Sequence, residues 1–430
     1  MKVVWICHFS DEKTREKIIF SRFYFVNIYR FIAGKPSVSH DDMAIWVSNA
    51  IKEFEKFEDI SLTVIFPHKA IKGHNQSFSI NGVEYICFRS EDDTWKFFVL
   101  NKLFRRYKNR YINNRAFIKK QLIQINPDII HVIGAENPYY SISALDIPDN
   151  KPCLLSLQTL MSDPLFYKNY PINPAEYAFR SGLEKEIIKK NRYIGSSITR
   201  YKEIVLKDIN PNAVFLNIPL AVGLDMDLAE SEKFFDFVYF SADISKAADD
   251  AIEAFALASK QRPGITLNIS GGYSECVRQT LDQRIEELGI VKQVFFTGSQ
   301  SKHSDVLKQI KKSRFALLPL KIDMISGTIR EAMACGLPVV STITPETPNL
   351  NKKRESILLS EKGNYEAMAE NMLRLLNDKS LEDRLKKNSA DTIWEMYSNV
   401  KFMSNWRKAY YDIIANFNDG LPLTRDLLLV

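Results

Sequence analysis

A chain of 430 residues, 45% of them hydrophobic, is too long for one ordinary core and suits two domains of roughly 200 residues each. None of its apolar runs reaches the roughly 18 residues that cross a bilayer, and its five cysteines are scattered without a Cys-x-x-Cys pair, so neither a disulfide framework nor a zinc site is expected. The net charge is +6, but the sequence contains no nucleic-acid recognition motif. We therefore expect no nucleic acid as partner.

The N-terminal half alternates short apolar runs with helical patterns. This alternation is typical of a doubly wound α/β domain, which we place at residues 1–222. The chain enters its first strand without a signal-peptide cleavage pattern, so a cytoplasmic protein is expected. Strands are predicted at 3–7, 62–66, 85–88, 129–133, 152–157 and 214–216, and helices at 43–54 and around 184–190.

Residues 96–120 carry nine lysines and arginines and no acidic residue. Aromatic and aliphatic residues recur between them at helical spacing, which favours an amphipathic basic helix. Each basic residue near an anionic leaflet contributes about 1 kcal/mol, so such a helix would hold the protein weakly at the inner face of a membrane. A solvated helix face whose apolar side packs on the core explains the pattern equally well.

A linker is expected at 217–233, where a proline, a glycine and several acids break the pattern. A second Rossmann-like domain follows at 223–400, and a helix in 401–430 is expected to cross back onto the first domain. Strands are predicted at 235–240, 265–269, 294–296, 315–320 and from 339, and helices at 247–259, 277–288, 307–311, 368–376, 381–388, 391–397 and 406–416.

The segment from Phe315 to Thr342 is the most informative part of the chain. An apolar strand is followed by Ser326-Gly327-Thr328, a short helix, and a second strand after Gly336 and Pro338. In such βαβ units, backbone N–H groups at the helix N-terminus favour a phosphate or another anion. The unit also holds two carboxylates eight positions apart, Asp323 and Glu331.

Asp323, Glu331 and the following Ala-Met-Ala-Cys-Gly-Leu-Pro-Val-Val resemble the Glu-x7-Glu signature of the retaining GT-B glycosyltransferases, in particular family 4. The resemblance implies an α/β GT-B fold, in which two Rossmann-like doubly wound domains face a central cleft. It implies that Asp323 touches the donor sugar, that Ser326, Gly327 and Thr328 lie at the diphosphate, and that Glu331 binds the ribose. Asp323 stands where the family usually has Glu.

Glu331 also has a purely structural explanation. Thr328-x-x-Glu331 fits a capping box, in which the Glu satisfies a backbone N–H at the helix start. The order of strand, small-residue loop, helix and second strand favours the nucleotide-sugar site.

Further candidates follow the ends of other predicted strands. Lys246 stands where the family has a Lys that neutralises the diphosphate, while Ser241 and Ala242 replace the usual Gly-Arg; a surface lysine is the alternative. His131 lies in a segment that resembles the Pro-Asp-Ile-Ile-His of the family and is a candidate catalytic residue, with a hydrogen-bonded core histidine as the alternative.

The acceptor side is less clear in the sequence. His8 and Ser10, in a first loop that lacks the glycines of many family members, and Glu136, after His131, are its candidates.

The function that the resemblance implies is transfer of a sugar from a nucleotide-diphospho-sugar, with UDP or GDP as the expected nucleotide. The acceptor would be a hydroxyl of a glycan or lipid-linked oligosaccharide in polysaccharide biosynthesis. The anomeric configuration would be retained, and neither a metal nor another cofactor is expected. Two alternatives stay open: a GT-B nucleotide-sugar epimerase, and a non-catalytic nucleotide-sugar-binding subunit, which Ala242 and Asp323 would suit.

Overall fold

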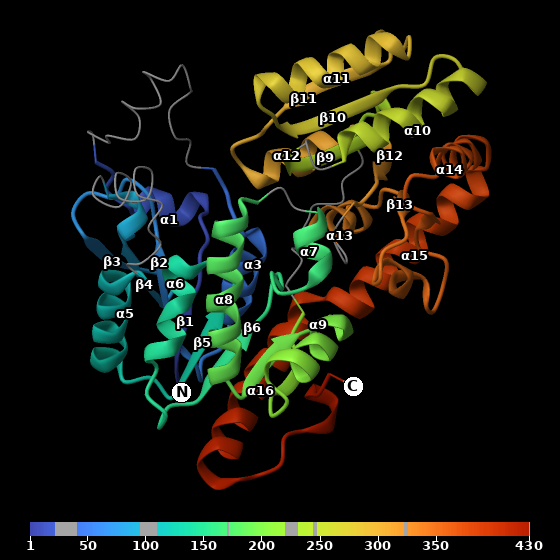
Figure 1. Ribbon diagram of the computed structural model, residues 1–430. Coiled ribbons are helices and arrows are strands. Elements are labelled where there is room, and N and C mark those ends of the chain that lie inside the picture. The colour runs from blue at the N-terminus through green and yellow to red at the C-terminus, as the bar shows by residue number, and fades with distance from the viewer. Residues whose placement is uncertain are drawn as a thin grey trace. The chain divides into compact units, whose positions relative to one another are not determined.

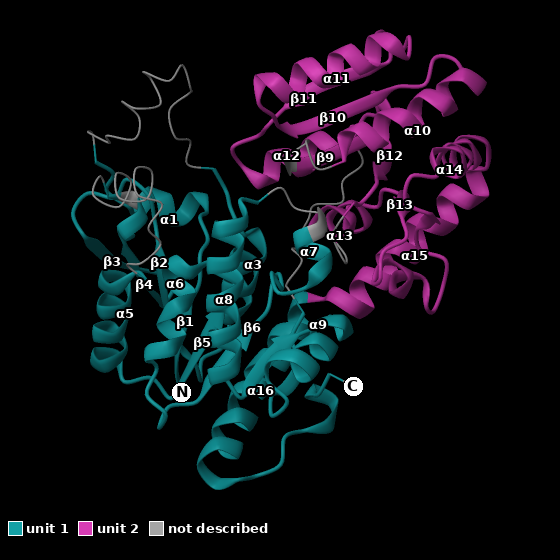
Figure 2. Ribbon diagram, viewed as in Figure 1, with its two compact units in different colours: residues 1–221, 399–430 teal, residues 222–398 magenta. Residues whose placement is uncertain are grey.

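The computed structural model describes residues 1–21, 41–94, 110–169, 172–219, 231–243, 247–321 and 326–429. The chain forms two compact units (Figure 2). The first comprises Met1–Ala221 and Asn399–Val430, and the second comprises Val222–Ser398. Each unit is built on one sheet with helices between most of its successive strands (Figure 1), which confirms the predicted α/β class.

The sheet of the first unit has eight strands in the order β3-β4-β2-β1-β5-β6-β7-β8. All neighbours are parallel except β3, which pairs antiparallel with β4. The strands are β1 (Lys2–Ile6), β2 (Ser61–Pro67), β3 (Asn75–Ile80), β4 (Val83–Phe88), β5 (Ile129–Ile133), β6 (Cys153–Ser156), β7 (Tyr193–Ser196) and β8 (Val214–Asn217). The helices are α1 (Glu12–Lys17), α3 (Ile45–Phe54), α5 (Ile112–Ile125), α6 (Pro138–Ser141), α7 (Pro164–Asn169), α8 (Pro174–Lys190), α9 (Thr199–Ile204) and α16 (Asn399–Asp419).

Helices cover both faces of this sheet because successive residues of a strand point to opposite faces. On one face, side chains of β1 and β5 join residues of α5 and α8 in the main apolar core; these are Val4, Ile6, Ile130, Val132, Ile118, Leu122, Ile187 and Ile188. On the other face, the ring of Trp5 lies 4.9 Å from that of Phe54 in α3 and 5.5 Å from that of Trp406 in α16. The C-terminal helix is therefore part of the core of the first unit.

The sheet of the second unit has six parallel strands in the order β11-β10-β9-β12-β13-β14. The strands are β9 (Phe235–Asp243), β10 (Leu267–Gly272), β11 (Val294–Gly298), β12 (Ser313–Leu318), β13 (Val339–Thr342) and β14 (Leu358–Ser360). The helices are α10 (Ala248–Gln261), α11 (Glu275–Glu287), α12 (His303–Ile310), α13 (Gly327–Ala334), α14 (Tyr365–Asn377) and α15 (Lys379–Tyr397).

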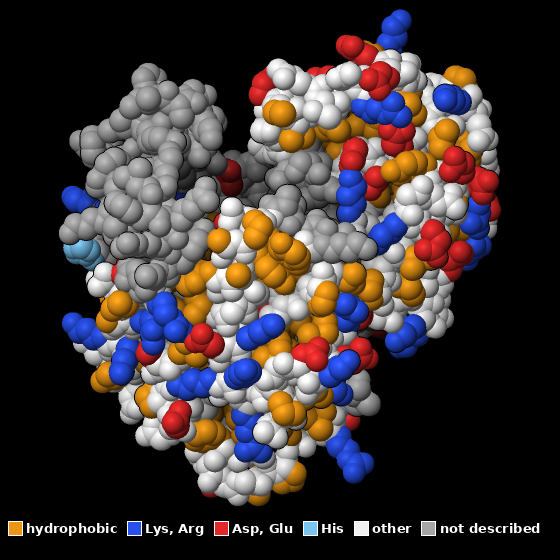
Figure 3. Space-filling view, in the orientation of Figure 1, with side chains coloured by type: hydrophobic (Ala, Val, Ile, Leu, Met, Phe, Trp, Pro, Cys, Tyr) orange, Lys and Arg blue, Asp and Glu red, His pale blue; other side chains and the backbone are white. Residues whose placement is uncertain are grey.

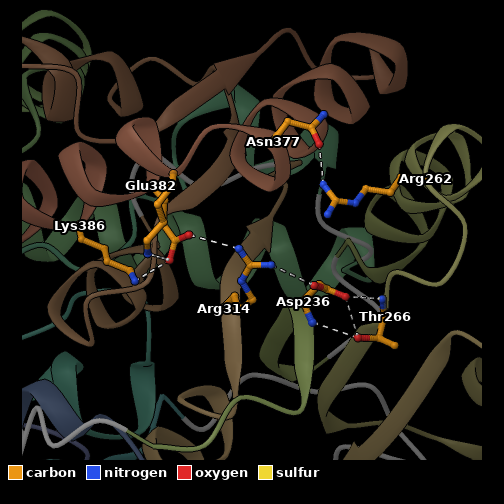
Figure 4. Close-up of polar contacts among 8 residues, drawn as sticks. Asp236, Arg262, Thr266, Arg314, Asn377, Glu382 and Lys386 are labelled. Atoms are coloured by element: carbon orange, nitrogen blue, oxygen red, sulfur yellow. Dashed lines mark hydrogen bonds and ion pairs between the residues drawn. The ribbon is translucent and has the colours of Figure 1, made fainter.

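A group of charged side chains joins α15 to the amino ends of β9 and β12 (Figure 4). Arg314 in β12 lies 3.5 Å from the carboxylate of Asp236 in β9 and 3.2 Å from that of Glu382 in α15. Asp236 also accepts a hydrogen bond from the backbone N–H of Thr266, and Glu382 pairs with Lys386 at 2.6 Å. These contacts lie at the amino edge of the sheet and leave the carboxyl edge to the predicted site.

Candidate functional site

In the second unit, the donor-binding candidates that the structure describes are Ser326, Gly327, Thr328 and Glu331, which follow β12 at the switch point of the sheet. From the central strand β9 the chain first moves outward through β10 and β11, then returns to pair β12 with the other side of β9. Ligands of open α/β sheets bind at the carboxyl ends of the two strands where this reversal occurs. The loops after β9 and β12 contain Lys246 and Asp323, which lie outside the described residues, as does the side chain of Ala242.

Helix α13 begins at this edge with a side-chain cap. Ser326 is the N-cap residue, and its Oγ accepts a hydrogen bond from the backbone N–H of Ile329 at 3.3 Å. The same oxygen lies 2.7 Å from Oγ1 of Thr328. The first N–H groups of a helix have no acceptor within the helix, and the helix dipole makes this end electropositive. The backbone N–H groups of Gly327 and Thr328 therefore lie where an anionic group is favoured.

Glu331 is not part of a capping box, so the structural explanation considered for it is wrong. The helix begins two residues earlier than that explanation required, with Ser326 as N-cap and Ile329 as its third residue. Oε1 of Glu331 lies instead 3.5 Å from Nε2 of His303, the first residue of α12. Burial raises the pKa of Glu331 to about 7, against the opposing charge of Arg330. A carboxyl group with a perturbed pKa at the strand ends of a sheet is typical of a binding site.

The first unit has its own switch point between β1 and β5, and two predicted acceptor-side residues follow these strands. His8 follows β1, and its Nδ1 lies 2.5 Å from the hydroxyl of Tyr139. Burial lowers the pKa of His8 to about 4, and the charges of His68 and Lys69 add to this effect. His8 is therefore a neutral imidazole at physiological pH.

Glu136 follows β5 and is 8% exposed. Its Oε1 accepts a hydrogen bond of 3.0 Å from the side-chain amide of Asn137, while its Oε2 is buried without a hydrogen-bond partner among the described residues. Burial raises the pKa of this carboxyl to about 7. An unsatisfied buried oxygen costs about 1–3 kcal/mol, so Glu136 is the acceptor-side candidate whose geometry points to a ligand.

A glycine allows these polar side chains to gather. Gly134 has a φ of +95°, and a Cβ atom built there would lie 2.5 Å from Oη of Tyr140, 2.8 Å from Nε2 of Gln158 and 3.0 Å from Oε1 of Glu136. Only glycine adopts this backbone conformation without strain and leaves room for the three groups.

Ser10 serves the local fold. Its side chain is buried, and its Oγ accepts a hydrogen bond of 3.0 Å from Arg15 and lies 3.4 Å from Nε2 of His68. Its backbone pairs with that of Met43. These contacts account for Ser10 without a ligand.

His131 is the hydrogen-bonded core histidine that the sequence left open as the alternative to a catalytic residue. It is fully buried, with Nδ1 2.7 Å from Oη of Tyr410 and Nε2 2.7 Å from Oγ of Ser156. Burial lowers its pKa to about 3. Because both ring nitrogens are engaged and β5 continues to Ile133, the contacts give no support to a role of His131 at a sugar.

His303 is the residue that the sequence analysis missed. It follows the carboxyl end of β11, five residues after the left-handed Gly298. In a sheet whose strands are all parallel, every loop after a strand reaches the same edge. The location of His303 after a predicted strand therefore indicates that it lies at the edge of the candidate site. Neither the sequence spacing nor a motif connects His303 to Glu331.

No three His, Cys, Asp or Glu side chains among the described residues lie close enough to hold a metal ion. The hollow of about 470 Å³ lined by Lys189, Arg192, Asn212 and their neighbours lies at the amino ends of β7 and β8, at the opposite edge from His8 and Glu136. It holds none of the predicted residues.

The basic segment 96–120 is described only from Arg110 onward. Arg110 pairs with Glu186 and Arg115 with Asp146, while Lys119 and Lys120 are exposed. Figure 3 shows lysine and arginine side chains dispersed among acidic and uncharged ones on the face that it draws. Within the described part of the chain, no helix is long and apolar enough to cross a membrane.

The comparison with known families concerns the second unit. Residues 228–392 match the glycosyl transferases group 1. The matched segment takes up most of the second unit. N-acetyl-alpha-D-glucosaminyl L-malate synthase of Bacillus anthracis is 23% identical over 235 residues, which cover 55% of this chain and 58% of that protein. The alignment thus spans little more than half of the relative.

Solved structures of GT-B proteins match the fold over nearly the whole chain. Sucrose-phosphate synthase from Thermosynechococcus elongatus superposes with a TM-score of 0.68 at 13% identity, covering 96% of this chain and 100% of that one. Anabaena HepE in complex with UDP gives a TM-score of 0.63 at 12% identity, with 96% and 100% covered. These likenesses confirm the predicted GT-B fold of two Rossmann-like units.

Proposed function

We propose that this protein is a retaining glycosyltransferase of GT-B family 4 that moves a sugar from a nucleotide-diphospho-sugar to a hydroxyl of a glycan or lipid-linked acceptor. One observation carries the proposal: the N-terminus of α13 lies at the switch point of the second unit, and Glu331 stands one turn further in without a capping role. The group 1 domain and the UDP held by Anabaena HepE support a nucleotide as the ligand.

The donor would be bound by charge complementarity. The N–H groups of Gly327 and Thr328, together with Lys246, would stabilise the negative charge that grows on the diphosphate as the glycosidic bond breaks. The Glu331 carboxylate would accept hydrogen bonds from the ribose hydroxyls. The leaving phosphate itself would take the proton of the acceptor hydroxyl, and Lys246 and the N–H groups would neutralise the diphosphate in place of a metal ion.

In the first unit, Glu136 is the proposed contact for the acceptor. Its buried Oε2 has no partner among the described residues, and an acceptor hydroxyl would supply one. His8 and Tyr139 would line the same edge. A lipid-linked acceptor would bring the enzyme to an anionic membrane surface, where Lys119 and Lys120 would add a weak attraction.

Nucleotide binding tests the proposal most directly. We expect UDP or GDP to raise the melting temperature of the protein and to bind in isothermal titration calorimetry. We expect Glu331→Gln to weaken this binding about tenfold, because a hydrogen bond to a charged group contributes about 1.5–3 kcal/mol. The control is Glu370→Gln, an exposed glutamate of α14 in the same unit, which should leave the affinity unchanged. Unchanged affinity in Glu331→Gln would contradict the proposed site.

Turnover then separates transfer from the two alternatives. The protein is incubated with UDP-, GDP- and ADP-sugars and a membrane lipid extract in the presence of EDTA. Release of nucleoside diphosphate that depends on the extract, with an α-linked product from an α-linked donor, supports the proposal. An isomerised donor without added acceptor indicates an epimerase, and binding without any reaction indicates a binding subunit.

A further inference from the structure

The contact between His303 and Glu331 joins two helices that start at the same edge of the second unit's sheet. Helix α12 follows β11 and leads back across the sheet to β12, while α13 follows β12 (Figure 1). Nε2 of His303 lies 3.5 Å from Oε1 of Glu331, and the two side chains are 21% and 23% exposed. The pair is thus accessible to a ligand on one side and supported by the protein on the other.

The chemistry of the pair suits a carboxylate that must be held for a ligand. A contact at Oε1 leaves Oε2 and the remaining lone pairs to accept hydrogen bonds from other donors. Vicinal hydroxyls bind well to an ionised and oriented carboxylate, and a neighbouring imidazole favours the ionised form. Burial works against ionisation here, because it raises the pKa of Glu331.

We propose that His303 is a positioning residue for the nucleotide: it holds the Glu331 carboxylate in the orientation that accepts hydrogen bonds from the ribose hydroxyls. The inference rests on the proposed function and adds a residue from α12 to the donor site.

The alternative is a partly exposed ion pair that supports only the packing of α12 against α13. Such pairs usually contribute between 0 and 1 kcal/mol to stability. The two roles differ in one measurable respect. A packing role would change the affinity for every nucleotide by the same factor, whereas a role through Glu331 depends on the ribose hydroxyls.

The test compares UDP with 2′-deoxy-UDP in isothermal titration calorimetry on the full chain. If GDP binds wild type more tightly than UDP, GDP and 2′-deoxy-GDP are used. Wild type should prefer the ribonucleotide about tenfold or more, as expected for one hydrogen bond to a charged group. In His303→Ala and His303→Leu, we expect affinity for the ribonucleotide to fall about five- to tenfold and affinity for the deoxyribonucleotide to change less than twofold.

Two further variants complete the design. His303→Gln keeps a nitrogen donor and should restore most of the preference for ribose. Ser304→Ala, an exposed neighbour on α12, should behave as wild type. Circular dichroism shows whether each variant is folded, and the leucine variant, which fills a similar volume, replaces the alanine variant if the latter unfolds.

The outcomes distinguish this inference from the proposed function. Equal loss of both nucleotides in the folded variants, or no loss of either, would overturn the role of His303 while leaving the nucleotide site in place. If wild type bound neither UDP nor GDP, the proposed function itself would fall, and the inference with it.

Discussion

His131 and Tyr410 are joined by a contact of 2.7 Å between Nδ1 and the phenolic oxygen, although 279 residues separate them. The same oxygen accepts a hydrogen bond of 2.8 Å from Nε1 of Trp5, and Nε2 of His131 lies 2.7 Å from Oγ of Ser156. Every bond is satisfied when Tyr410 donates to Nδ1 and the Nε2–H of His131 donates to Ser156. One hydroxyl on α16 thus completes a buried chain of hydrogen bonds in the first unit.

We expect Tyr410→Phe to lower the free energy of unfolding by about 2–3 kcal/mol, because it leaves a buried indole N–H and a buried imidazole nitrogen unpaired. The control is its neighbour Tyr411→Phe. Tyr411 is 43% exposed and bonds to Asp59 at the surface, so its loss should cost less than about 1 kcal/mol. Urea denaturation followed by tryptophan fluorescence measures both, and equal losses would show that the buried chain contributes no more than a surface contact.

Gly134→Ala should destabilise the protein by about 3 kcal/mol. The left-handed φ costs a non-glycine residue about 1–2 kcal/mol, and the new methyl group would collide with Tyr140 and Gln158. Gly182→Ala is the matched change, since Gly182 lies exposed in α8 with nothing within 4 Å of its Cβ position. It should stabilise the protein by up to about 1 kcal/mol. A tolerated Gly134→Ala would show that the turn after β5 can rearrange.

Glu184 should make stability depend on pH between about 4.5 and 7. The side chain is fully buried, and burial raises its pKa from 4.5 to about 7 although Met161 and Ser162 donate hydrogen bonds to it. Across this range the unfolded chain releases the proton and the folded chain keeps it. The protonated Glu184 therefore contributes to the free energy of unfolding at pH 4.5, and this contribution is lost as the pH rises to 7. The free energy of unfolding falls by at most about 1.4 kcal/mol per pH unit across this range.

Glu184→Gln removes this titration, so its unfolding free energy should fall less steeply between pH 5 and 7 than that of wild type. Glu186→Gln is the control, because that carboxylate is half-exposed and pairs with Arg110 at the surface. Denaturation curves at pH 5, 6 and 7 give the slopes. A slope that is identical in wild type and Glu184→Gln would mean that Glu184 is ionised in the folded protein.

Arg314→Met should lower the free energy of unfolding by about 1 kcal/mol, because the side chain of Glu382 is only 4% exposed and loses one of its cationic partners. Arg314 is itself 34% exposed, which keeps the effect small. Arg262→Met serves as the control, since Arg262 bonds at the surface to the neutral amide of Asn377 (Figure 4). Thermal melting should separate the two variants, and a lower melting temperature for Arg262→Met would reverse our ranking of these contacts.

Most of the fold follows from sequence patterns where burial is uniform. The apolar runs at β1, β2, β5 and β12 were predicted nearly residue for residue, because strands buried on both faces have few other ways to form. Strand β3 was missed, since Asn75–Ile80 is polar and lies at the edge of the sheet. The Asn81-Gly82 pair that joins it to β4, with φ of +50° and +81°, was the overlooked hairpin signal.

Helix α15 was predicted as two helices because a polar stretch interrupts its apolar pattern. In the structure one helix runs through Ser389, whose hydroxyl donates a hydrogen bond of 2.6 Å to the carbonyl of Ser356. The hydroxyl of Thr392 lies 2.7 Å from the hydroxyl of Ser356. Tertiary hydrogen bonds satisfy the polar side chains, and local periodicity does not reveal such partners.

The candidate site divides in the same way. The helix N-terminus at Ser326 and the carboxylate of Glu331 follow from the local order of strand, loop and helix. The partners of His131 and Glu331 do not, because Tyr410 and His303 come from distant parts of the sequence. A histidine in an apolar strand has the same local pattern whether it binds a sugar or supports the core, and only its three-dimensional neighbours separate the two.

The assignment of α16 to the first unit has a consequence for biosynthesis. The second unit is a continuous segment, Val222–Ser398, whereas the first unit is interrupted by it. A ribosome therefore releases every residue of the second unit before it supplies Trp406 and Tyr410, which cover Trp5. Until then, the ring of Trp5 lacks its packing partners from α16. During this stage of synthesis the first unit therefore exposes apolar surface to which a chaperone would bind.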